Sequence, residues 1–582
     1  MKRIAIIDQE KCRPSKCNYK CMKTCPVYRF NKEVIKLDEK QKPVISEILC
    51  TGCGICQKFC PFGAIKIVRL PEEEEEKLLH KYPSGFRLYG LPPIKMNSVV
   101  GILGPNGTGK TTTVSILSGA IVPNFGRDET SKEYVLERFK KTEYYQYFEK
   151  LYNNEIKVVV KPQNISAISQ LFANKYCREI IEQYDEEKVA KDILEEFEYL
   201  DILNKKVKEL SGGGLQILAV TVALSRSSDV LFLDEPSIYL DVKRRFKLLK
   251  LIKEYKRETT FLVDHDLIVL DGVSDYVCIL FGEPGAFGMY SSIKSTKNGI
   301  NEFLNGYLKE ENVRIRSKPI SFRKRVRLTQ ESSETLTIVE YEQLHKKLGD
   351  FELLVEPGKI SSHDIIGVVG ENCIGKSTFA RILAKELKPD QGSVKGDIKI
   401  SYKPQEITYQ ENITVKEFIG KFDAFIKNEI MSSFEIVKLL DLELDSLSGG
   451  ELQKVWIVKT LAKDVDLYIL DEPSAFLDVE NRVKLAKILA NFIEKKRKAM
   501  FIVDHDLQII DYVCSKVIVF NGQPNKKGHA SSPMDIKDGL NEFLRNLEIT
   551  FRRDMETYRL RINDIGSRKD VEQKEQNIYY PM

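Results

Sequence analysis

A glycine-rich motif occurs twice in this chain, each time between a short apolar run and a segment with helical periodicity. It reads GPNGTGKTT at residues 104–112 and GENCIGKST at residues 370–378. A strand, a glycine-rich loop and a helix in this order predict a P-loop, in which backbone N–H groups, a lysine and the helix N-terminus hold phosphates. Two P-loops in one chain of 582 residues predict two nucleotide-binding α/β domains related by duplication.

Further motifs follow each P-loop in the same order. The apolar runs VLFLDEP and LYILDEP predict buried strands that end in paired acids. The first acid of each pair is suited to hold Mg²⁺ through water, and the second is placed to polarise an attacking water. LSGGG and LSGGE stand before the acids, and VDHD follows them twice. The separation from Ser211 to Asp234 is 23 residues, as is that from Ser448 to Asp471. Two complete sets exclude an accidental glycine turn.

Eight of the twelve cysteines lie in the first 60 residues. The run at 50–60 reads C-x2-C-x2-C-x3-C before a proline, which is the bacterial ferredoxin pattern, and the run at 12–25 is a looser version. In two-cluster ferredoxins the fourth cysteine of each run ligates the other cluster. We therefore expect two [4Fe–4S] clusters, one held by Cys12, Cys17, Cys21 and Cys60 and the other by Cys50, Cys53, Cys56 and Cys25.

A pair of four-cysteine zinc sites is the alternative, but zinc sites usually pair two separate knuckles. Iron–sulfur clusters either carry electrons or hold together a fold that is too small for its own core. A structural role is favoured, because no redox partner domain is visible in the rest of the chain. The other four cysteines are scattered and are predicted to be packing residues: Cys177, Cys278, Cys373 and Cys514.

Composition limits the class of protein. The chain has 90 basic and 85 acidic residues, a net charge of +5, which is too balanced for binding a polyanion over the whole surface. No apolar stretch approaches the roughly 18–20 residues needed to cross a bilayer. The N-terminus lacks the pattern of a signal peptide. We therefore expect a cytoplasmic protein with no membrane anchor.

The LSGG sequences resemble the signature of ABC ATPases. With an eight-cysteine module before two such domains, the chain resembles one family, the ribosome-recycling ABC proteins, also called the RNase L inhibitor family or ABC subfamily E. A repeated segment, which reaches GINEFL at 299–304 and GLNEFL at 539–544, and the ending ITFRRD…SRKDVEQK resemble the same family. The implied fold is α/β, with two ABC-type P-loop ATPase domains paired head to tail and a small α+β ferredoxin-like domain at the N-terminus.

The resemblance also implies roles for the motif residues, with ATP and Mg²⁺ as ligands. The catalytic residues would be two glutamates and two switch histidines: Glu235, Glu472, His265 and His505. Mg²⁺ would be held by Thr111, Gln163, Ser377 and Gln405. In the first repeat the residues that contact nucleotide would be Tyr82, Phe86, Gly104, Asn106, Gly107, Gly109, Lys110, Thr111, Thr112, Gln163, Ser211, Gly213, Asp234 and Asp241. In the second repeat they would be Tyr341, Phe351, Gly370, Asn372, Gly375, Lys376, Ser377, Thr378, Gln405, Ser448, Gly450, Asp471 and Asp478. The four aromatics match those that the family stacks on adenine, although taken alone they are equally compatible with a core.

The motifs divide the chain into five expected segments. They are a ferredoxin-like domain at 1–70, a first ABC domain at 71–283, a first hinge at 284–325, a second ABC domain at 326–523, and a second hinge with the C-terminal tail at 524–582. The first repeat has 53 residues from Lys110 to Gln163, against 29 from Lys376 to Gln405. The extra segment, near 128–150, predicts one or two amphipathic helices. The family carries there a helix-loop-helix that touches the small ribosomal subunit, whereas a solvated insertion is the alternative.

Two stretches are locally basic. One spans residues 314–327, and the other is the tail around Arg552, Arg553, Arg559 and Arg561. Charge runs are usually solvated, but the family places these hinge elements on ribosomal RNA, so phosphate contact is an equal alternative. The acidic run at 72–76 predicts an exposed linker.

The resemblance implies a function in translation. The protein, a monomer in itself, is expected to bind a terminated or stalled ribosome beside a release-factor-like partner, with contacts to RNA and proteins of the small subunit. ATP-driven closure would swing the iron–sulfur module against that partner and split the subunits. The protein would then stay on the small subunit and help initiation, with initiation factors as further partners.

The sequence departs from the family pattern at three places. The first signature has Gly214 and Ile217 where the family has Glu and Arg, the second P-loop has Cys373 where glycine is usual, and Asp264 and Asp504 stand where Glu is usual. In head-to-tail pairing the second P-loop meets the first signature, so the first two changes fall in one composite site. We expect the two sites to be unequal, unless P-loops tolerate these changes because their essential donors are backbone N–H groups.

Three other functions remain open from the sequence. An ATP-gated electron-transfer protein would also combine clusters with an ATPase. The soluble ATPase of a transporter would need a membrane partner and does not carry an eight-cysteine module. A DNA-repair ABC ATPase would have its domains split by a long heptad coiled coil, which this chain lacks.

Overall fold

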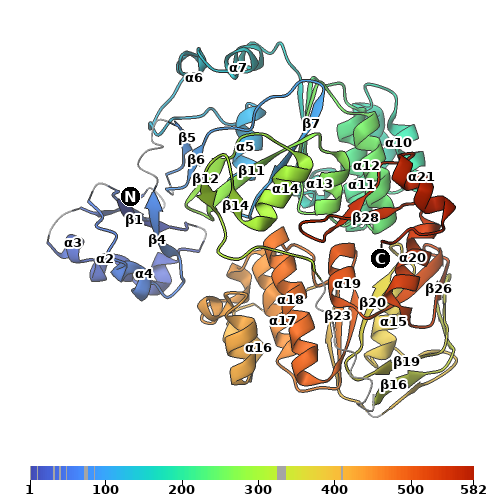
Figure 1. Ribbon diagram of the computed structural model, residues 1–582. Coiled ribbons are helices and arrows are strands. Elements are labelled where there is room, and N and C mark those ends of the chain that lie inside the picture. The colour runs from blue at the N-terminus through green and yellow to red at the C-terminus, as the bar shows by residue number, and fades with distance from the viewer. Residues whose placement is uncertain are drawn as a thin grey trace.

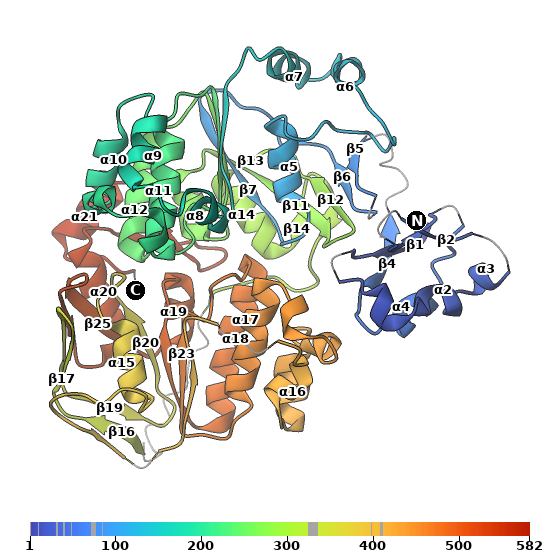
Figure 2. The same ribbon diagram turned by 180° about the vertical axis from the view of Figure 1, so that it is seen from behind.

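The computed structural model describes residues 2–9, 11–30, 33–38, 41–47, 49–70, 77–83, 85–323, 336–396, 398–407 and 411–581. Figure 1 shows a small N-terminal module beside two larger α/β lobes, one above the other. The C-terminal segment, coloured red, lies between the lobes in this view and in the reverse view of Figure 2. The basic residues Lys324, Arg325 and Arg327 and the acidic run at 72–76 lie outside the described residues.

The N-terminal module has an α+β fold. β1 (Lys2–Ile7) pairs antiparallel with β4 (Ile65–Leu70), and β2 (Ile35–Leu37) pairs antiparallel with β3 (Pro43–Ile45). Four short helices lie in or beside the cysteine runs: α1 (Pro14–Cys17), α2 (Lys20–Thr24), α3 (Pro26–Arg29) and α4 (Ile55–Phe59). The cysteines are themselves part of the small core, because a module of this size has few other apolar side chains to bury.

The first lobe is built on a nine-stranded sheet. Its strand order is β5-β6-β12-β11-β7-β10-β9-β8, with β13 paired to β11. The five strands from β11 to β8 are parallel, and their continuous apolar sequences fit a sheet that is covered on both faces. The bounds are β5 (Leu78–Lys81), β6 (Arg87–Tyr89), β7 (Ser98–Leu103), β8 (Val158–Lys161), β9 (Val230–Asp234), β10 (Thr259–Val263), β11 (Tyr276–Glu283), β12 (Phe287–Tyr290) and β13 (Lys294–Ser295).

The second lobe repeats this sheet. Its order is β17-β18-β26-β25-β20-β24-β23-β22, with β27 paired to β25, so each strand of the first sheet has a counterpart. A separate three-stranded sheet, β19-β16-β21, is added to this lobe. The bounds are β16 (Thr337–Tyr341), β17 (Leu344–Leu348), β18 (Phe351–Val355), β19 (Gly358–Ser361), β20 (Ile365–Val369), β21 (Val394–Lys395), β22 (Ile400–Lys403), β23 (Leu467–Asp471), β24 (Ala499–Val503), β25 (Lys516–Gln523), β26 (Lys527–Ala530) and β27 (Met534–Asp535).

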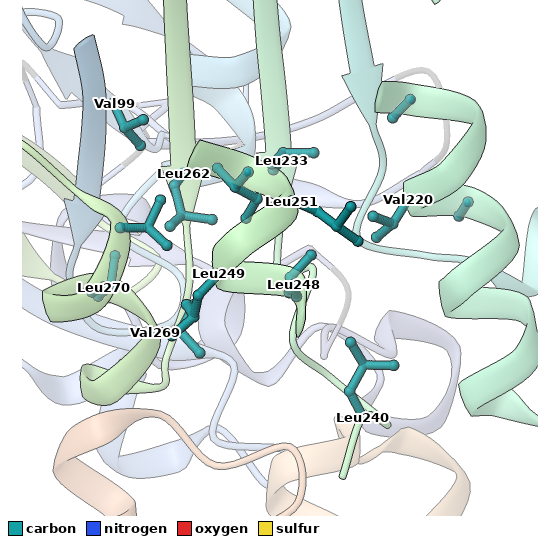
Figure 3. Close-up of a cluster of buried hydrophobic side chains, with 14 of the residues drawn as sticks. Val99, Val220, Leu233, Leu240, Leu248, Leu249, Leu251, Leu262, Val269 and Leu270 are labelled. Atoms are coloured by element: carbon teal, nitrogen blue, oxygen red, sulfur yellow. The ribbon is translucent and has the colours of Figure 1, made fainter. Parts of the chain in front are cut away.

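Helices cover both sheets. Those of the first lobe are α5 (Lys110–Leu117), α8 (Ser166–Phe172), α9 (Cys177–Tyr184), α10 (Ala190–Glu196), α11 (Gly212–Ser225), α12 (Val242–Glu254), α13 (Leu267–Val273) and α14 (Thr296–Asn305). Those of the second lobe are α15 (Lys376–Leu383), α16 (Val415–Ile419), α17 (Gly449–Leu461), α18 (Val479–Lys496), α19 (Leu507–Val513) and α20 (Ile536–Asn546). Figure 3 shows the packing in the first lobe, where leucines of α12 meet Leu233 and Leu262 of the sheet and Val220 of α11.

The extra segment of the first repeat contains two helices, α6 (Lys132–Phe139) and α7 (Tyr145–Tyr152). They lie at the outer edge of the first lobe, away from the second lobe, in both views. Phe139, Tyr147 and Phe148 bury their rings against the lobe, and Phe139 stacks on Phe148 with ring centroids 4.9 Å apart. The insertion is therefore a packed pair of helices with its polar side outward.

The first hinge begins later than we expected from the sequence. β12 and β13 lie within the segment 284–325, yet both belong to the first sheet. The same holds for β26 and β27 in the segment 524–582. The elements of these two segments outside the sheets are α14 with the short strands β14 (Tyr307–Leu308) and β15 (Val313–Arg314), and α20 with the C-terminal hairpin of β28 (Phe551–Arg553) and β29 (Leu560–Ile562), followed by α21 (Arg568–Glu575).

The arginines of the tail do not form a free basic face, because Arg553, Arg559 and Arg561 pair with aspartates of the two lobes. Arg559 is completely buried and lies 3.2 Å from Asp271 of α13, which Arg561 also contacts at 2.6 Å. Arg553 forms two bonds of 2.9 Å with Asp511 of α19. Arg552 donates to an asparagine oxygen of the same hairpin at 2.8 Å. The hairpin is thus tied to a helix of each lobe.

In the described parts of the chain, no helix combines the length and the apolar character needed to span a bilayer.

Candidate functional site

Both P-loops have the same geometry. α5 and α15 begin at Lys110 and Lys376, each after a glycine with left-handed φ, +105° at Gly109 and +101° at Gly375. Each lysine is buried, and its Nζ donates to the carbonyl oxygen six residues before it, at 2.9 and 2.8 Å. Burial lowers the pKa of both lysines, while nearby carboxylates act in the opposite direction. Each lysine therefore curls over its own glycine-rich loop, which is the place for a phosphate group.

The second acid of each pair meets a glutamine that lies two residues after the neighbouring strand, β8 or β22. Gln163 Nε2 donates to Glu235 Oε1 at 2.7 Å, and Gln405 Nε2 donates to Glu472 Oε1 at 2.7 Å. Both glutamates have left-handed backbone, with φ of +49° and +47°. Such a conformation costs a non-glycine residue about 1–3 kcal/mol and is concentrated at functional sites.

The histidines of the VDHD sequences also face these glutamates. His265 Nε2 lies 3.4 Å from Glu235 Oε1, and His505 Nε2 lies 3.6 Å from Glu472 Oε1. Burial, followed by the charge of the P-loop lysine, lowers the pKa of both histidines. Each glutamate is thus held between a glutamine and a histidine.

The aspartate before each histidine has a structural partner. Asp264 accepts a bond of 2.8 Å from the hydroxyl of Ser237, and Asp504 accepts one of 2.6 Å from Ser474. These serines follow the acid pairs in the sequence LDEPS. The aspartate, which is shorter than the glutamate usual at this position, therefore connects the loop of the acid pair to the loop of the histidine in both lobes.

The acid pairs differ in electrostatics although their geometry is alike. Burial, and then the charge of Glu235, raises the pKa of Asp234 to about 7. Burial also acts on Glu235, but the bond to His265 and the charge of Lys110 outweigh it and bring its pKa to about 2. Burial and the charge of Asp471 raise the pKa of Glu472 to about 7.

Oxygen donors are grouped at the end of the second P-loop. Burial raises the pKa of Asp471, and a hydrogen bond with the hydroxyl of Ser377 partly offsets this. A hydroxyl and a carboxylate side by side are the donors that Mg²⁺ takes in nucleotide sites. The residues present therefore fit a magnesium ion.

The two lobes contact each other head to tail through these motifs. Asp241 accepts a bond of 2.8 Å from the backbone N–H of Asn372 in the opposite P-loop, and Asp478 accepts one of 3.4 Å from Asn106. The side chain of Asn372 also donates to the carbonyl oxygen of Tyr239 at 3.2 Å. The contact that includes the second P-loop is the tighter of the two.

The structure divides the four predicted adenine-stacking aromatics. Phe86 and Phe351 have equivalent positions against the glycine before each P-loop lysine, and the Phe86 ring lies 6.3 Å from that of Tyr82. Tyr341 is different: it is 1% exposed, packs on Phe379 and belongs to the core. Stacking on adenine is therefore wrong for Tyr341, because its ring is enclosed by the lobe itself. Cys373 is also not the packing residue we expected, since it is exposed and has a φ of +59°.

Sequence reasoning missed two residues behind each glutamate. Lys161 and Lys403 donate to the carbonyl oxygens of the acid pairs, and burial lowers the pKa of each lysine to about 8. Gln216 and Gln453, on the helices after the signatures, donate to the same glutamate carbonyls at 2.9 and 2.7 Å. The signal was present in the sequence, because KPQ and LSGG-x-LQ recur in both repeats.

The cysteines of the N-terminal module line two cavities. Cys25, Cys50, Cys53 and Cys56 line the first, together with apolar side chains that include Ala5, Val34 and Ile67. Cys12, Cys17, Cys21 and Cys60 line the second, together with prolines and Phe62. The structure thus brings the fourth cysteine of each run to the other three-cysteine set. Four thiols around an apolar cavity fit an iron–sulfur cluster.

The donors do not converge as they would on one ion. Within the described ranges, no group of three or more His, Cys, Asp or Glu residues is arranged to hold a single metal ion. The pKa of Cys12 and that of Cys56 are raised to about 12, first by burial and then by the neighbouring thiols. Such thiols give up their protons when a metal group binds.

The module also contacts the second lobe. Lys11 Nζ lies 2.5 Å from Glu451 Oε1, and Lys16 Nζ lies 2.7 Å from Glu443. Glu451 belongs to the second signature, where it caps α17 together with Ser448. On the side of the first lobe, Glu47 of the module pairs with Lys81 and Arg87. The module therefore bridges both lobes beside one composite site.

Comparison with known proteins agrees with this geometry. The family model of ABC transporters matches residues 93–238 and 357–475, one of a possible Fer4-like domain in RNase L inhibitor matches residues 3–33, and one of a 4Fe-4S binding domain matches residues 43–66. Translation initiation factor RLI1 of Saccharomyces cerevisiae is 38% identical, over 99% of this chain and 98% of that protein. This chain belongs to the RNase L inhibitor family. It is an ABC ATPase with a module that binds [4Fe–4S] clusters.

Other proteins match this chain over a similar length. An uncharacterised ABC transporter ATP-binding protein of Methanocaldococcus jannaschii is 45% identical, over 99% of this chain and 97% of its own length. Among solved structures, a model of ribosome-bound archaeal Pelota and ABCE1 has 44% identity and a TM-score of 0.91, with 100% of this chain and 99% of that chain covered. A complex of archaeal ribosomal stalk protein aP1 and the archaeal ribosome recycling factor aABCE1 has a TM-score of 0.83, 43% identity and coverage of 87% and 99%.

Proposed function

We propose that this chain is an ATP-driven ribosome recycling factor, which splits terminated or stalled ribosomes into subunits together with a release-factor-like protein. The observation that carries the proposal is likeness over the whole chain, module included, to ribosome-bound archaeal ABCE1 in its structure with Pelota, at a TM-score of 0.91. The proposed place of action is the cytoplasm, on the small subunit, where the protein then remains at initiation. Ribosomal RNA, ribosomal proteins and initiation factors are the further proposed partners.

ATP hydrolysis would supply the force. In each composite site the P-loop binds the phosphates, and the signature of the opposite lobe completes the site. The hydroxyls of Thr111 and Ser377 and the amides of Gln163 and Gln405 would hold Mg²⁺, which supplies positive charge against the phosphates. Glu235 and Glu472 orient and polarise the attacking water, and the histidines sense the γ-phosphate. These roles are supported by the paired contacts of each glutamate.

Closure of the lobes would move the module. The module is linked to the first lobe by the chain and by Glu47, yet Lys11 and Lys16 hold acids of the second lobe. A change in the angle between the lobes cannot preserve both sets of contacts. The module therefore swings when ATP draws the signatures onto the P-loops, and it pushes against the release-factor-like partner at the subunit interface.

Two [4Fe–4S] clusters are proposed for the module, one in each cysteine-lined cavity. Bound clusters would supply covalent cross-links in a module whose own core is small. The proposed role is therefore structural, since it gives the module the stiffness to transmit force.

Paired substitutions test the ligand sets. Cys25→Ser with Cys50→Ser, both in one proposed cluster, is expected to lower the iron content from about eight to about four per chain. Cys25→Ser with Cys12→Ser, in different clusters, is expected to remove all iron, and Cys373→Ser serves as the control. About four irons remaining in the Cys12 and Cys25 variant, and none in the other, would instead assign each run its own cluster.

Sedimentation tests the function. Ribosomes are mixed with this protein, a release-factor-like protein and either ATP or a non-hydrolysable analogue, and then separated on a sucrose gradient. With ATP the subunits are expected to separate, and with the analogue the protein is expected to remain on the small subunit. Failure to sediment with ribosomes in either condition would leave the ATPase but remove the ribosomal function.

A further inference from the structure

A buried lysine lies behind each proposed catalytic glutamate. Lys161 ends β8 and Lys403 ends β22, and their side chains are 1% and 0% exposed. Lys161 Nζ donates to the carbonyl oxygens of Asp234 and Glu235 at 2.9 and 3.1 Å. Lys403 Nζ makes the same two bonds in the second lobe, at 2.7 and 3.4 Å. The two lysines thus make equivalent contacts in the two lobes of the same chain.

These carbonyl groups flank the strained residue of each site. The left-handed φ of Glu235 and Glu472 turns the chain sharply just after the strand, and such a turn persists only when its surroundings over-determine it. The backbone N–H of Glu235 is fixed by the carbonyl of Val263 at 2.7 Å. Lys161 bonds the carbonyl of that same peptide, which is Asp234 C=O, and also the next carbonyl, that of Glu235, which Gln216 bonds too. A charged donor forms a stronger bond than a neutral one.

The same strand end also holds the glutamate side chain. Gln163 follows Lys161 by two residues and bonds the carboxylate of Glu235, while Gln405 follows Lys403 by two and bonds Glu472. Backbone and carboxylate of each glutamate are therefore both bound to a three-residue segment. A displacement of that segment by nucleotide is transferred to the glutamate directly.

The charge around each lysine also has a pattern. Three carboxylates act on Lys161, those of Asp234, Glu235 and Asp264, and the equivalent three act on Lys403. Buried carboxylates that share a small volume repel one another, and a cation between their backbones offsets part of that repulsion. The lysine thus lowers the electrostatic cost of placing these carboxylates close together in a buried site.

We propose that Lys161 and Lys403 are positioning residues for ATP hydrolysis. Each lysine fixes the backbone of its left-handed glutamate and connects it to the segment that contains the glutamine. The carboxylate therefore reaches its catalytic position only when that segment is in its closed position. The inference rests on the proposed role of the glutamates, but not on any ribosomal partner. It concerns how the attacking water is aligned and leaves phosphate binding to the P-loop.

Substitution by methionine tests the proposal, because methionine keeps the unbranched shape and removes the charge. Lys161→Met is measured in a Glu472→Gln chain, where only the first P-loop site hydrolyses, and Lys403→Met in a Glu235→Gln chain. ATPase kinetics and ATP affinity are measured without ribosomes. We expect kcat to fall at least about 10-fold while the ATP dissociation constant changes less than about threefold, since small misplacements of a reacting group cost rate rather than binding.

Each lysine has a matched control four residues earlier. Lys157→Met and Lys399→Met remove exposed lysines just before the same strands, and both are expected to leave kcat unchanged. A fall of kcat in the control variants as large as in the Lys161 and Lys403 variants would overturn the proposal. So would a parallel loss of ATP affinity in the Lys161 and Lys403 variants.

A double-mutant cycle separates positioning from a general loss of structure. The cycle uses the residual single-turnover rate of a chain that carries both Glu235→Gln and Glu472→Gln. If Lys161 acts through Glu235, then Lys161→Met lowers this residual rate no further, although it lowers kcat in the Glu472→Gln chain. An additive loss would overturn the proposal. If Lys161→Met lacks a cooperative thermal transition, Lys161→Gln replaces it, because the neutral amide NH2 of glutamine can still donate to a carbonyl oxygen. A kcat loss of at least about threefold with ATP affinity preserved is then expected. A wild-type kcat in that folded variant would contradict the inference.

Discussion

At the scale of single residues, the two composite sites are built alike but are not identical. The second P-loop contains Cys373 with a φ of +59°, where glycine would be free of strain. The signature that faces it contains Gly214, so Ser211 bonds only a backbone N–H, whereas Ser448 has a full capping box with Glu451. A Cβ added at Gly214 would lie 3.1 Å from the hydroxyl of Tyr199, so a side chain requires Tyr199 to shift.

We predict that these two departures slow the second P-loop site. Cys373→Gly with Gly214→Glu is expected to raise the rate of single-turnover hydrolysis at least about threefold in a Glu235→Gln chain, where that site alone is active, because cap and loop then match the other site. Rapid-quench measurement of phosphate provides the rate. The same pair in a Glu472→Gln chain is the control, since its active site contains neither change. An unaltered rate in the first chain would show that the departures are neutral.

The sequence predicted most of the residues of the candidate site, and its errors were confined to particular residues. The P-loops, acid pairs, glutamines and histidines were predicted because each is a short motif with local chemistry. Tyr341 was placed wrongly because a sequence gives the residue type but not the burial. Lys161 escaped notice because its partners are backbone carbonyls more than 70 residues away, at Asp234 and Glu235.

At the scale of elements, the C-terminal hairpin of β28 and β29 contacts a helix of each lobe. Asp271 of α13 and Asp511 of α19 each lie six residues after the histidine of a VDHD sequence, and both form ion pairs with arginines of this one hairpin. The buried Tyr580 completes the second pair by donating to Asp511. The hairpin therefore joins the helices that follow both histidines. These contacts could not be predicted from the sequence, because a basic run has the same composition whether its side chains face solvent or pair with buried acids.

We predict that the buried pair of Arg559 and Asp271 contributes strongly to stability. Arg559→Met leaves Asp271, which is 1% exposed, with Arg561 alone, and removal of one partner of a buried pair costs about 3–5 kcal/mol. The expected result is an earlier midpoint of urea unfolding, followed by circular dichroism. Arg568→Ala is the control, because Arg568 is 91% exposed and its pair with Glu572 contributes little. Equal midpoints for the two variants would refute the prediction.

At the scale of the whole molecule, one small module contacts both lobes at the edge of a composite site. Its ion pairs to the second lobe are partly exposed, with Lys11 26% and Glu451 20% exposed. Pairs of this kind contribute roughly 0.2–1 kcal/mol each, so the docked position is easily released. This suits a part that must swing in each cycle. The duplication of the lobes could be predicted from repeated motifs, but the docking could not, since Lys11 and Glu451 are 440 residues apart.

We predict that Lys11→Ala loosens this docking without unfolding the module. Amide hydrogen exchange in residues 443–451 is expected to rise by about two- to fivefold, as the loss of one partly exposed ion pair implies. Iron content should remain that of the wild type. Lys20→Ala, on the same module, is the control. Exchange that stays the same in Lys11→Ala would mean that the ion pair does not hold the module.

The central claim is that ATP-driven closure acts on the ribosome through the module, and light scattering tests it most directly. Ribosomes with a release-factor-like protein and ATP are mixed with the full chain or with a chain that begins at residue 77. The account predicts that the full chain lowers the scattering as subunits separate, whereas the shortened chain hydrolyses ATP and leaves the scattering unchanged. Splitting by the shortened chain at the rate of the full chain would contradict the account.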